Sequence, residues 1–196
     1  EILFRFFTVY LTGGTSFPAQ EFTLPSGLLC TLRSPEPEDA AALLDYLRVT
    51  SGETENVVRY PAEVPSSLVE ERVFLHQCAA SGRQVMLAVF GAGKALGSAG
   101  VTPIGNEKKL RHRAEVGISL RKAYWGMGLG TRLMEIAIDL ARQMGYEQLE
   151  LEVVSHNLRA KHLYEKLGFV SCGEIPHGFR LRSGEYAPLE RMAKFL

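Results

Sequence analysis

The sequence contains little cysteine and no cluster of metal-binding residues. Only Cys30, Cys78 and Cys172 occur in 196 residues, an odd number with no C-x-x-C pair. A disulfide framework or a zinc site usually needs regularly spaced pairs, so neither is expected. The five histidines form no H-x-x-x-H pair and no Cys/His cluster. We therefore expect reduced thiols, a cytoplasmic location and no metal cofactor.

The sequence also lacks an excess of charge of either sign. Lys and Arg number 22, and Asp and Glu number 22, so the formal net charge is zero. Because nucleic-acid-binding proteins usually carry a basic excess, we expect no nucleic acid partner. One basic cluster has two interpretations, namely steering of a nucleotide phosphate or a solvated hairpin end, and the second is favoured. It comprises Lys108, Lys109, Arg111, His112 and Arg113.

No hydrophobic run is long enough to cross a bilayer. The apolar segment EILFRFFTVYL, residues 1–11, is shorter than the roughly 20 residues that a spanning helix needs. It also lacks the basic start and clear cleavage site of a signal peptide, so no membrane partner is expected. We divide the chain into an N-terminal extension, residues 1–20, and a single domain, residues 21–196. The extension has three open interpretations: an extra edge strand, an arm that binds a partner or supports a homodimer, or an artefact of upstream reading.

A glycine-rich loop that leads into a helix is the most informative stretch. In YWGMGLGTRLMEIAIDLARQMG, residues 124–145, Gly126, Gly128 and Gly130 precede an amphipathic segment. Glycine lets the backbone turn tightly and approach a ligand closely. A helix N-terminus presents free N–H groups and the positive end of the helix dipole, which favour phosphate. Arg132 lies in the first turn, and within this stretch no acidic residue precedes Glu135. The stretch therefore predicts a phosphate site.

The loop lacks the residues that two common phosphate motifs require. The P-loop needs a lysine after its last glycine, and none stands here. Thr131 occupies the position of the last glycine in the dinucleotide fingerprint G-x-G-x-x-G. Taken alone, the loop has a second interpretation, in which its glycines only pack a helix against a sheet.

A second motif, NLRAKHLYEKLGF at residues 157–169, favours the ligand-binding interpretation. Together, an aromatic residue with W-G-x-G-x-G-x-x-L-M and the later N-x-R-A-x-x-L-Y-x-K-x-G-F closely resemble the GNAT superfamily of acyl-CoA-dependent N-acetyltransferases. The resemblance extends from about Val85 to Phe169. Trp125 departs from the R/Q-x-x-G-x-G pattern of the family, which removes one cationic phosphate contact and leaves the backbone donors in place.

The pattern of elements and the resemblance together predict an α/β fold: a mixed, mostly antiparallel central sheet flanked by helices, with a glycine loop–helix cofactor site. One βαβ unit is expected around the glycine loop. Strands are expected within residues 22–33, 84–90, 95–104, 110–120 and 148–154, from 169 onward, and at 189–196. Helices are expected from the start signal at residues 34–39 to about Val49, from 66 or 67 to 80, after the glycine loop to Gly145, and at 157–167.

The resemblance implies acetyl-CoA as cosubstrate and a primary amine of a small molecule or peptide as acceptor. It implies that Ile118, Ser119 and Leu120 pair their backbone with the pantetheine arm, with an N–H near Leu120 facing the thioester oxygen. Asn157 would bind the pantetheine, cap its own helix, or do both. The remaining cofactor-binding residues implied are Trp125, Gly126, Met127, Gly128, Leu129, Gly130, Thr131, Arg132 and Lys161.

Two residues are expected to be catalytic. By the same resemblance, Tyr164 is the general acid that protonates the departing thiolate; alternatively, it is a helix aromatic packed in the core. The resemblance also implies that Glu115, on the strand that leads to the cofactor edge, is the base that deprotonates the amine, directly or through water. Glu150, Glu152 and His156 are weaker candidates for that role, and a solvated or ion-paired strand residue is the alternative for each carboxylate.

The resemblance also implies that acceptor selection falls to the first two helices with their loop, residues 50–65, and to the late hairpin, residues 176–187. Within the first segment, Glu53, Glu55 and Glu63 either attract a cationic amine or are ordinary solvated acids. Two other classes of function stay open. One is a catalytically silent acyl-CoA-binding or regulatory domain, which would not need Tyr164. The other is a nucleotide-binding fold without acyl transfer, which the two missing phosphate motifs disfavour.

Overall fold

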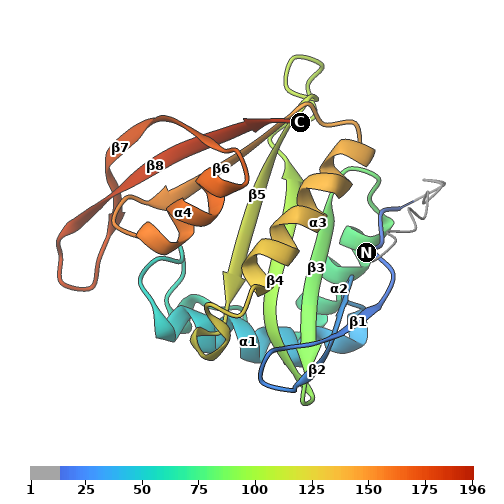
Figure 1. Cartoon of the computed structure of the whole chain (residues 1–196). Helices are drawn as coiled ribbons and strands as arrows, with labels where there is room; N and C mark the ends of the chain where they lie inside the picture. The colour runs from blue at the N-terminus through green and yellow to red at the C-terminus, as the bar shows by residue number, and fades with distance from the viewer. Residues whose placement is uncertain (1–13) are drawn as a thin grey trace.

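A computed structural model describes residues 14–196 as one sheet covered by helices on both faces (Figure 1). The strands are β1 Gln20–Thr23, β2 Leu29–Arg33, β3 Val85–Gly91, β4 Lys94–Pro103, β5 Arg113–Leu120, β6 Gln148–Val154, β7 Val170–Arg180 and β8 Tyr186–Phe195. The helices are α1 Ala40–Glu53, α2 Leu68–Ala80, α3 Leu129–Gln143 and α4 Leu158–Lys166. Short 3-10 turns lie at Pro37–Asp39, Pro61–Glu63 and Lys122–Tyr124.

The eight strands form one sheet in the order β1-β2-β3-β4-β5-β6-β8-β7. Neighbouring strands are antiparallel except for β5 and β6, which are parallel. A parallel pair needs a crossover connection, and α3 provides it. The predicted mixed, mostly antiparallel sheet and its βαβ unit are therefore confirmed.

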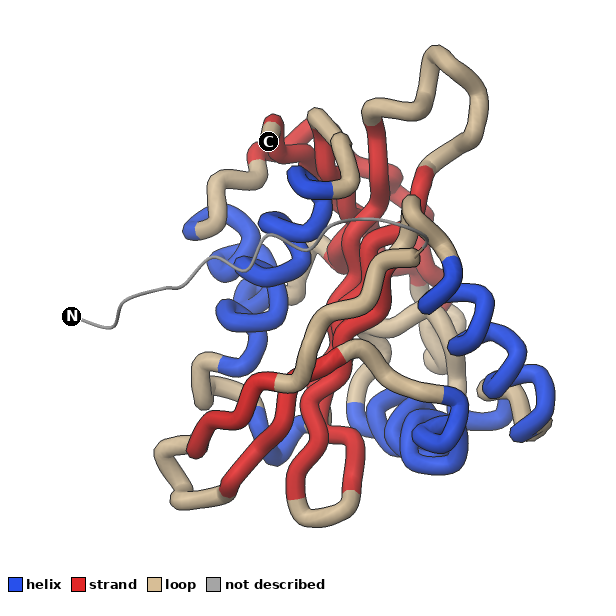
Figure 2. Tube along the Cα trace, turned by 90° about the vertical axis from the view of Figure 1, so that its right-hand side faces the viewer, coloured by secondary structure: helices blue, strands red, loops and turns tan. Residues whose placement is uncertain are grey.

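The helices divide between the two faces of the sheet (Figure 2). Residues of α3 and α4 pack with the inward side chains of β3 to β6 in the main hydrophobic core. On the opposite face, α1 and α2 pack in a smaller core around Leu43, Tyr46 and Leu75. The sheet therefore separates a face covered by α3 and α4 from a face covered by α1 and α2.

The parallel pair is much shorter than the strands that form it. β5 and β6 pair only over Arg113–Glu115 and Gln148–Glu150, although β5 continues to Leu120 and β6 to Val154. On its other edge, β6 pairs with β8 over its whole length. The two strands consequently separate along the molecule, as their ribbons do in Figure 1.

α3 is the most regular amphipathic helix and has the boundaries that its sequence predicts. Leu133, Ala137 and Ala141, spaced four apart, are fully buried against the sheet, as a helix covering a sheet requires. The helix ends at Gln143 with Met144 as its C-cap, and the next residue, Gly145, adopts a left-handed φ of 81°, which glycine tolerates without steric cost.

α1 extends four residues beyond the predicted end at Val49 and finishes at Glu53. The polar composition of residues 50–65, with Gly52, Pro61 and Pro65, predicts a loop from Thr50 onward, yet Thr50 and Ser51 are buried within the helix. The Thr50 hydroxyl donates to the carbonyl oxygen of Tyr46 at 3.0 Å, which satisfies its polar group without breaking the helix. The loop predicted at 50–65 therefore begins after Glu53.

α2 begins where its sequence predicts but buries little apolar surface. The Ser67 hydroxyl oxygen accepts a hydrogen bond from the Glu70 N–H at 3.2 Å, the usual role of serine before a helix. Leu75 and Cys78 are buried, whereas Val69 and Val73 are 70% and 50% exposed. This helix therefore contributes only a narrow stripe to the smaller core.

The predicted N-terminal extension lies only partly within the described residues. Residues 1–13, which include the apolar segment 1–11, lie outside them, so its three interpretations stay predictions. Residues from 14 onward pack on the domain: the Thr15 N–H donates to Ser81 O at 2.9 Å, and the Ser34 N–H donates to Phe17 O at 3.0 Å. β1 begins at Gln20, next to the predicted domain boundary.

Replacement of a core leucine of α3 should show how far the fold depends on this helix. Leu133 is fully buried, so Leu133→Ala should lower the free energy of unfolding by about 2–5 kcal/mol through lost burial and the cavity left behind. Urea denaturation measures this change. The matched control is Leu158→Ala, because Leu158 is 60% exposed and should change stability by about 0.5 kcal/mol or less. Equal losses in both variants would contradict the assignment of α3 to the core.

Candidate active site

The end of β5 presents backbone groups that no strand pairs with. The Arg113 carbonyl accepts a hydrogen bond from Ile104, and the Arg121 N–H donates to Leu96 O; both contacts lie on the β4 side. Backbone groups alternate in direction along a strand, and the β4–β5 register is regular. Ile118 and Leu120 therefore direct their N–H and C=O groups toward the side from which β6 has separated.

The glycine loop lies directly after this strand and turns by left-handed backbone at two positions. Gly126 and Gly128 have φ values of 77° and 81°, which residues with a side chain rarely adopt. Gly128 is the residue that precedes α3, and no side chain caps the helix. The first N–H groups of α3 at Leu129, Gly130 and Thr131 therefore remain available to an anion.

Arg132 stands in the first turn of α3 with its guanidinium incompletely satisfied. Its guanidinium carbon lies 4.3 Å from the centroid of the Phe22 ring of β1. Its Nε atom is buried and has no hydrogen-bond partner among the described residues. No acidic residue lies in the first turn of the helix. The Arg132 guanidinium and the open N–H groups of the helix together fit a phosphate group chemically.

The loop, the strand and α4 converge at Gly130. A methyl group at Gly130 would lie 3.2 Å from Leu163 Cδ2, 3.6 Å from Leu120 Cδ1 and 3.8 Å from Ile118 Cδ1. Leu163 precedes Tyr164 on α4. Residues predicted from two separate motifs are therefore brought together, and glycine at this position allows the close approach.

Trp125 links the same three elements. Its indole Nε1 donates to the carbonyl oxygen of Leu120 at 3.0 Å, which satisfies one acceptor at the open end of β5. The guanidinium carbon of Arg159, from α4, lies 5.1 Å from the centroid of the Trp125 ring. Arg159 was absent from the predicted set, although its position in the N-x-R-A motif was a signal for it. Arg159 is a cation beside the glycine loop, in which Trp125 replaces the R/Q residue of the family pattern.

Asn157 and Lys161 both have protein partners. The Asn157 side-chain oxygen accepts a hydrogen bond from the Ala160 N–H at 3.4 Å, so it caps α4; its predicted contact with pantetheine stays a prediction. The Lys161 ammonium forms an ion pair with Glu190 of β8 at 2.6 Å. This contact raises the pKa of Lys161, and the predicted role of Lys161 in cofactor binding also stays a prediction.

Tyr164 is buried in α4 close to the glycine loop. Only 7% of it is exposed, and its ring packs edge-on against Phe169 with centroids 6.0 Å apart. Burial raises the pKa of Tyr164 to about 12, because the charged phenolate loses solvation. The phenol is therefore protonated at neutral pH, as a proton donor must be.

The three candidate carboxylates differ in whether they form an ion pair with an arginine. Glu150 receives two hydrogen bonds from Arg113, at 2.5 and 2.8 Å, and these hold the pKa of Glu150 below its ordinary value. Glu152 pairs with Arg191 at 2.7 Å. Glu115 is exposed, and no hydrogen bond or ion pair reaches its carboxylate within residues 14–196. The ion-paired interpretation therefore fits Glu150 and Glu152, and Glu115 is the free carboxylate of the three.

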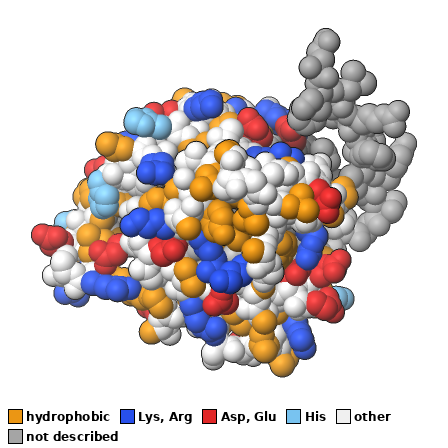
Figure 3. Space-filling view, turned by 60° about the horizontal axis from the view of Figure 1, so that its bottom comes forward, with side chains coloured by type: hydrophobic (Ala, Val, Ile, Leu, Met, Phe, Trp, Pro, Cys, Tyr) orange, Lys and Arg blue, Asp and Glu red, His pale blue; other side chains and the backbone are white. Residues whose placement is uncertain are grey.

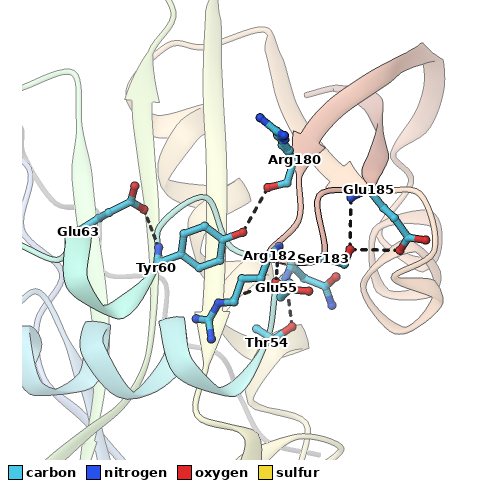
Figure 4. A network of polar contacts seen from close by, with 9 residues as sticks. Thr54, Glu55, Tyr60, Glu63, Arg180, Arg182, Ser183 and Glu185 are labelled. Carbon is cyan, nitrogen blue, oxygen red and sulfur yellow. Dashed lines mark hydrogen bonds and ion pairs between the residues drawn. The ribbon is translucent and has the colours of Figure 1, made fainter.

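A solvent-open hollow of about 430 Å³ lies between the loop after α1 and the hairpin of β7 and β8. The Tyr60 hydroxyl donates to Arg180 O at 3.2 Å, and the Arg182 N–H donates to Glu55 at 3.1 Å (Figure 4). Apolar and polar residues both line the hollow, namely Glu55, Val57, Val58, Tyr60, Gly178, Phe179, Arg180 and Leu181. These contacts hold together the two segments in which acceptor selection was predicted.

The three loop acids near this hollow each have a local partner. Glu53 accepts a hydrogen bond from the Lys122 N–H at 2.7 Å, Glu63 accepts one from the Tyr60 N–H at 2.8 Å, and Glu55 binds the Arg182 backbone. Lys and Arg are interspersed with Asp and Glu on the face seen in Figure 3. That face therefore carries no continuous acidic patch.

Residues 14–196 contain no group of three or more His, Cys, Asp or Glu side chains that could hold a metal ion. Their helices are too short or too polar for any of them to cross a membrane.

Comparison with known proteins identifies the family. The model of the acetyltransferase (GNAT) family matches residues 52–169, more than half of the chain. A crystal structure of a GNAT-family acetyltransferase from Streptococcus pneumoniae is 33% identical, with a TM-score of 0.81 over 85% of this chain and 99% of that one. A Salmonella typhimurium protein whose structure contains its cofactor acetyl-CoA is 20% identical, with a TM-score of 0.74 over 85% and 94% of the two chains, and shares the fold.

Two curated relatives are similar over shorter segments. Spermidine N(1)-acetyltransferase of Escherichia coli K12 is 35% identical over 98 residues, which cover 50% of this chain and 52% of the relative. The L-methionine sulfoximine/L-methionine sulfone acetyltransferase of Pseudomonas paraeruginosa is 27% identical over 114 residues, which cover 58% of this chain and 66% of the relative. The chain thus spans about half to two thirds of the length of these relatives.

The buried phenol of Tyr164 should make stability fall at alkaline pH. An unfolded tyrosine loses its proton near pH 10, whereas native Tyr164 keeps it until about pH 12. Between these values the unfolded state binds fewer protons, so the free energy of unfolding should fall by up to about 1.4 kcal/mol per pH unit. Urea denaturation from pH 9 to 11 of the wild type and of Tyr164→Phe isolates this effect. Parallel pH dependences in the two proteins would contradict it.

Proposed function

The chain belongs to the acetyltransferase (GNAT) family, and on that premise we propose that it transfers an acetyl group from acetyl-CoA to a primary amine. The acceptor is an amine of a small molecule or at a peptide end, and the transfer is direct. The observation that carries the proposal is the separation of β5 from β6 beside the glycine loop. It leaves an extended backbone edge next to open helix N–H groups, which suits an amide-containing arm that ends in a phosphate.

The donor is held mainly by backbone groups in this proposal. N–H groups of Leu129 to Thr131, with Arg132 and Arg159 nearby, bind the pyrophosphate. Ile118 and Leu120 pair with the amides of the pantetheine arm as a neighbouring strand would. The Leu120 N–H points at the thioester oxygen, where negative charge develops during acyl transfer. Trp125 keeps the Leu120 carbonyl occupied.

Tyr164 donates to the departing sulfur. Its high pKa, about 12, keeps the proton on the phenol until negative charge appears nearby. Complete transfer to a thiolate with an ordinary pKa of about 8.5 would be unfavourable. Tyr164 therefore stabilises the developing charge by a hydrogen bond before the proton moves.

Glu115 accepts the proton of the amine. It lies on β5 four residues before Ser119, on the same side of the strand, and it is exposed with no cation partner among residues 14–196. Arg113 and Arg191 pair with the other two carboxylates, so Glu115 is the one whose oxygens are open to an amine. Water can bridge the carboxylate and the amine.

The acceptor occupies the hollow between the loop after α1 and the β7–β8 hairpin. Apolar side chains such as Val57 and Phe179 contact the body of the acceptor, and the exposed Glu55 and Arg180 lie at the rim. The relatives are named for spermidine and for methionine sulfoximine and sulfone. Both are amine-bearing small molecules, which supports a small amine as acceptor.

The silent acyl-CoA-binding alternative would need neither a buried tyrosine on α4 nor a free carboxylate on β5. Tyr164 is buried on α4 next to Leu163, which approaches the glycine loop at Gly130, and Glu115 is exposed on β5; their presence favours the catalytic proposal. Free thiols at Cys30, Cys78 and Cys172 support a reducing, cytoplasmic location. A homodimer through an edge strand of the sheet or the N-terminal segment stays a prediction.

Removal of the Tyr164 hydroxyl tests the proposal directly. The wild type should acetylate members of a panel of polyamines, amino acids and small peptides when acetyl-CoA is supplied. Tyr164→Phe should lower kcat by about 10²-fold or more, with the KM for acetyl-CoA changed little, because the ring keeps its contact with Phe169. Release of free thiol and mass spectrometry of the acceptor measure the reaction. Unchanged kcat in Tyr164→Phe would exclude the donor role, and an inactive wild type that binds acetyl-CoA would support the silent alternative.

Replacement of Glu115 should slow the reaction most at low pH. Glu115→Gln removes the proton acceptor, so kcat/KM near pH 7 should fall by about 10²-fold. The deficit should shrink as pH approaches the pKa of the amine, because the acceptor is then already neutral. Glu152→Gln is the matched control and should stay within about twofold, since its exposed ion pair contributes little. A deficit that is constant with pH, or equal in the two variants, would rule out a base at Glu115.

A further inference from the structure

Tyr46 of α1 is fully buried, yet its hydroxyl makes polar contacts on the proposed donor strand. The hydroxyl donates to the Ser119 carbonyl oxygen at 2.8 Å and contacts the Ser119 hydroxyl. It also accepts a hydrogen bond from the Ser98 hydroxyl at 3.3 Å. One donated and two accepted hydrogen bonds use the whole capacity of a phenol. The group is thereby held in one orientation.

This cluster lies on the opposite side of the sheet from α3. Ser98 and Ser119 are register partners on β4 and β5, and α1 packs against that face. Tyr46 is completely excluded from solvent, and burial raises its pKa, so the phenol stays neutral and donates. A satisfied buried network of this kind makes the backbone around it rigid.

The Ser119 carbonyl shares a peptide group with the Leu120 N–H. All peptide bonds of the described chain are trans, so these two groups lie in one plane and point in opposite directions. A hydrogen bond that fixes the Ser119 oxygen on one side therefore fixes the direction of the Leu120 N–H on the other. It also polarises the amide, because hydrogen bonds in a chain strengthen one another.

We propose that Tyr46 is a positioning residue for acyl transfer, which orients and polarises the Leu120 N–H through the Ser119 carbonyl. The inference rests on the proposed function, in which that N–H faces the thioester oxygen. Tyr46 touches neither donor nor acceptor. Its effect should appear in the chemical step more than in binding, since an N–H aimed at developing charge acts chiefly in the transition state.

A second buried tyrosine offers a matched control. The Tyr146 hydroxyl donates to a backbone carbonyl, that of Arg83, at 2.5 Å, and only 4% of Tyr146 is exposed. Tyr146 follows α3 and precedes β6, away from the open end of β5. Tyr146→Phe therefore removes a comparable buried hydrogen bond without touching the peptide group of Ser119 and Leu120.

The experiment compares Tyr46→Phe with Tyr146→Phe in the full chain. Tyr46→Phe should lower kcat by about 10- to 100-fold, with the KM for acetyl-CoA within about threefold, whereas Tyr146→Phe should keep kcat within about twofold. Both variants should lose a similar amount of thermal stability. Equal losses of kcat, or a change confined to KM, would overturn the inference.

A second measurement separates this inference from the proposed function. In the ligand-free protein, the amide nitrogen resonance of Leu120 should move in Tyr46→Phe, because a hydrogen bond to the preceding carbonyl changes the electron density of the amide. It should stay in place in Tyr146→Phe. An unmoved Leu120 resonance in Tyr46→Phe would overturn the positioning role, even if the wild type acetylates no amine in the panel. A moved resonance supports the positioning role independently of the acceptor.

Discussion

β5 continues beyond the residues that pair with β6, and the other features of the site depend on the unpaired backbone that this leaves. A buried backbone group without a partner costs about 1–3 kcal/mol, so a central strand rarely leaves several N–H and C=O groups unpaired. Here β6 pairs with β8 throughout and meets β5 over only three residues. Trp125 satisfies the Leu120 carbonyl, and Gly130 lets α3 approach the strand and Leu163. The remaining groups are available to a ligand that resembles a strand.

In the proposed function, the sheet also separates two tasks. On the face covered by α3 and α4 lie the glycine loop, Arg132 and Tyr164, which suit a phosphate-bearing donor and its leaving group. On the face covered by α1 and α2 lie Glu115 and the cluster of Tyr46 and Ser119. The end of β5 is shared by both faces. Acyl transfer across such a strand needs a rigid backbone edge, because a misplacement of about 1 Å in the reacting groups can cost 10²-fold in rate.

Features that depend on local chemistry could be predicted from the sequence. Gly126 and Gly128 before an amphipathic helix, Gly145 after it, and Ser67 and Asn157 as helix caps all act on neighbouring backbone, so the element boundaries at these positions are close to those expected. Contacts between distant residues could not be predicted. The bond from Tyr46 to Ser119 spans 73 positions, and the pairing of Arg113 with Glu150 spans 37. The length of α1 was also missed, because Thr50 is satisfied by its own helix.

The most direct test of the central claim is isothermal titration of the full chain with acetyl-CoA and CoA, alongside ATP and NAD. If the open edge of β5 and the glycine loop form one donor site, acetyl-CoA and CoA should bind with one site per chain. ATP and NAD should bind far more weakly, because neither carries a pantetheine arm to pair with Ile118 and Leu120. Absence of CoA binding by the folded protein, or equal binding of all four ligands, would contradict the account and leave the glycines with a packing role.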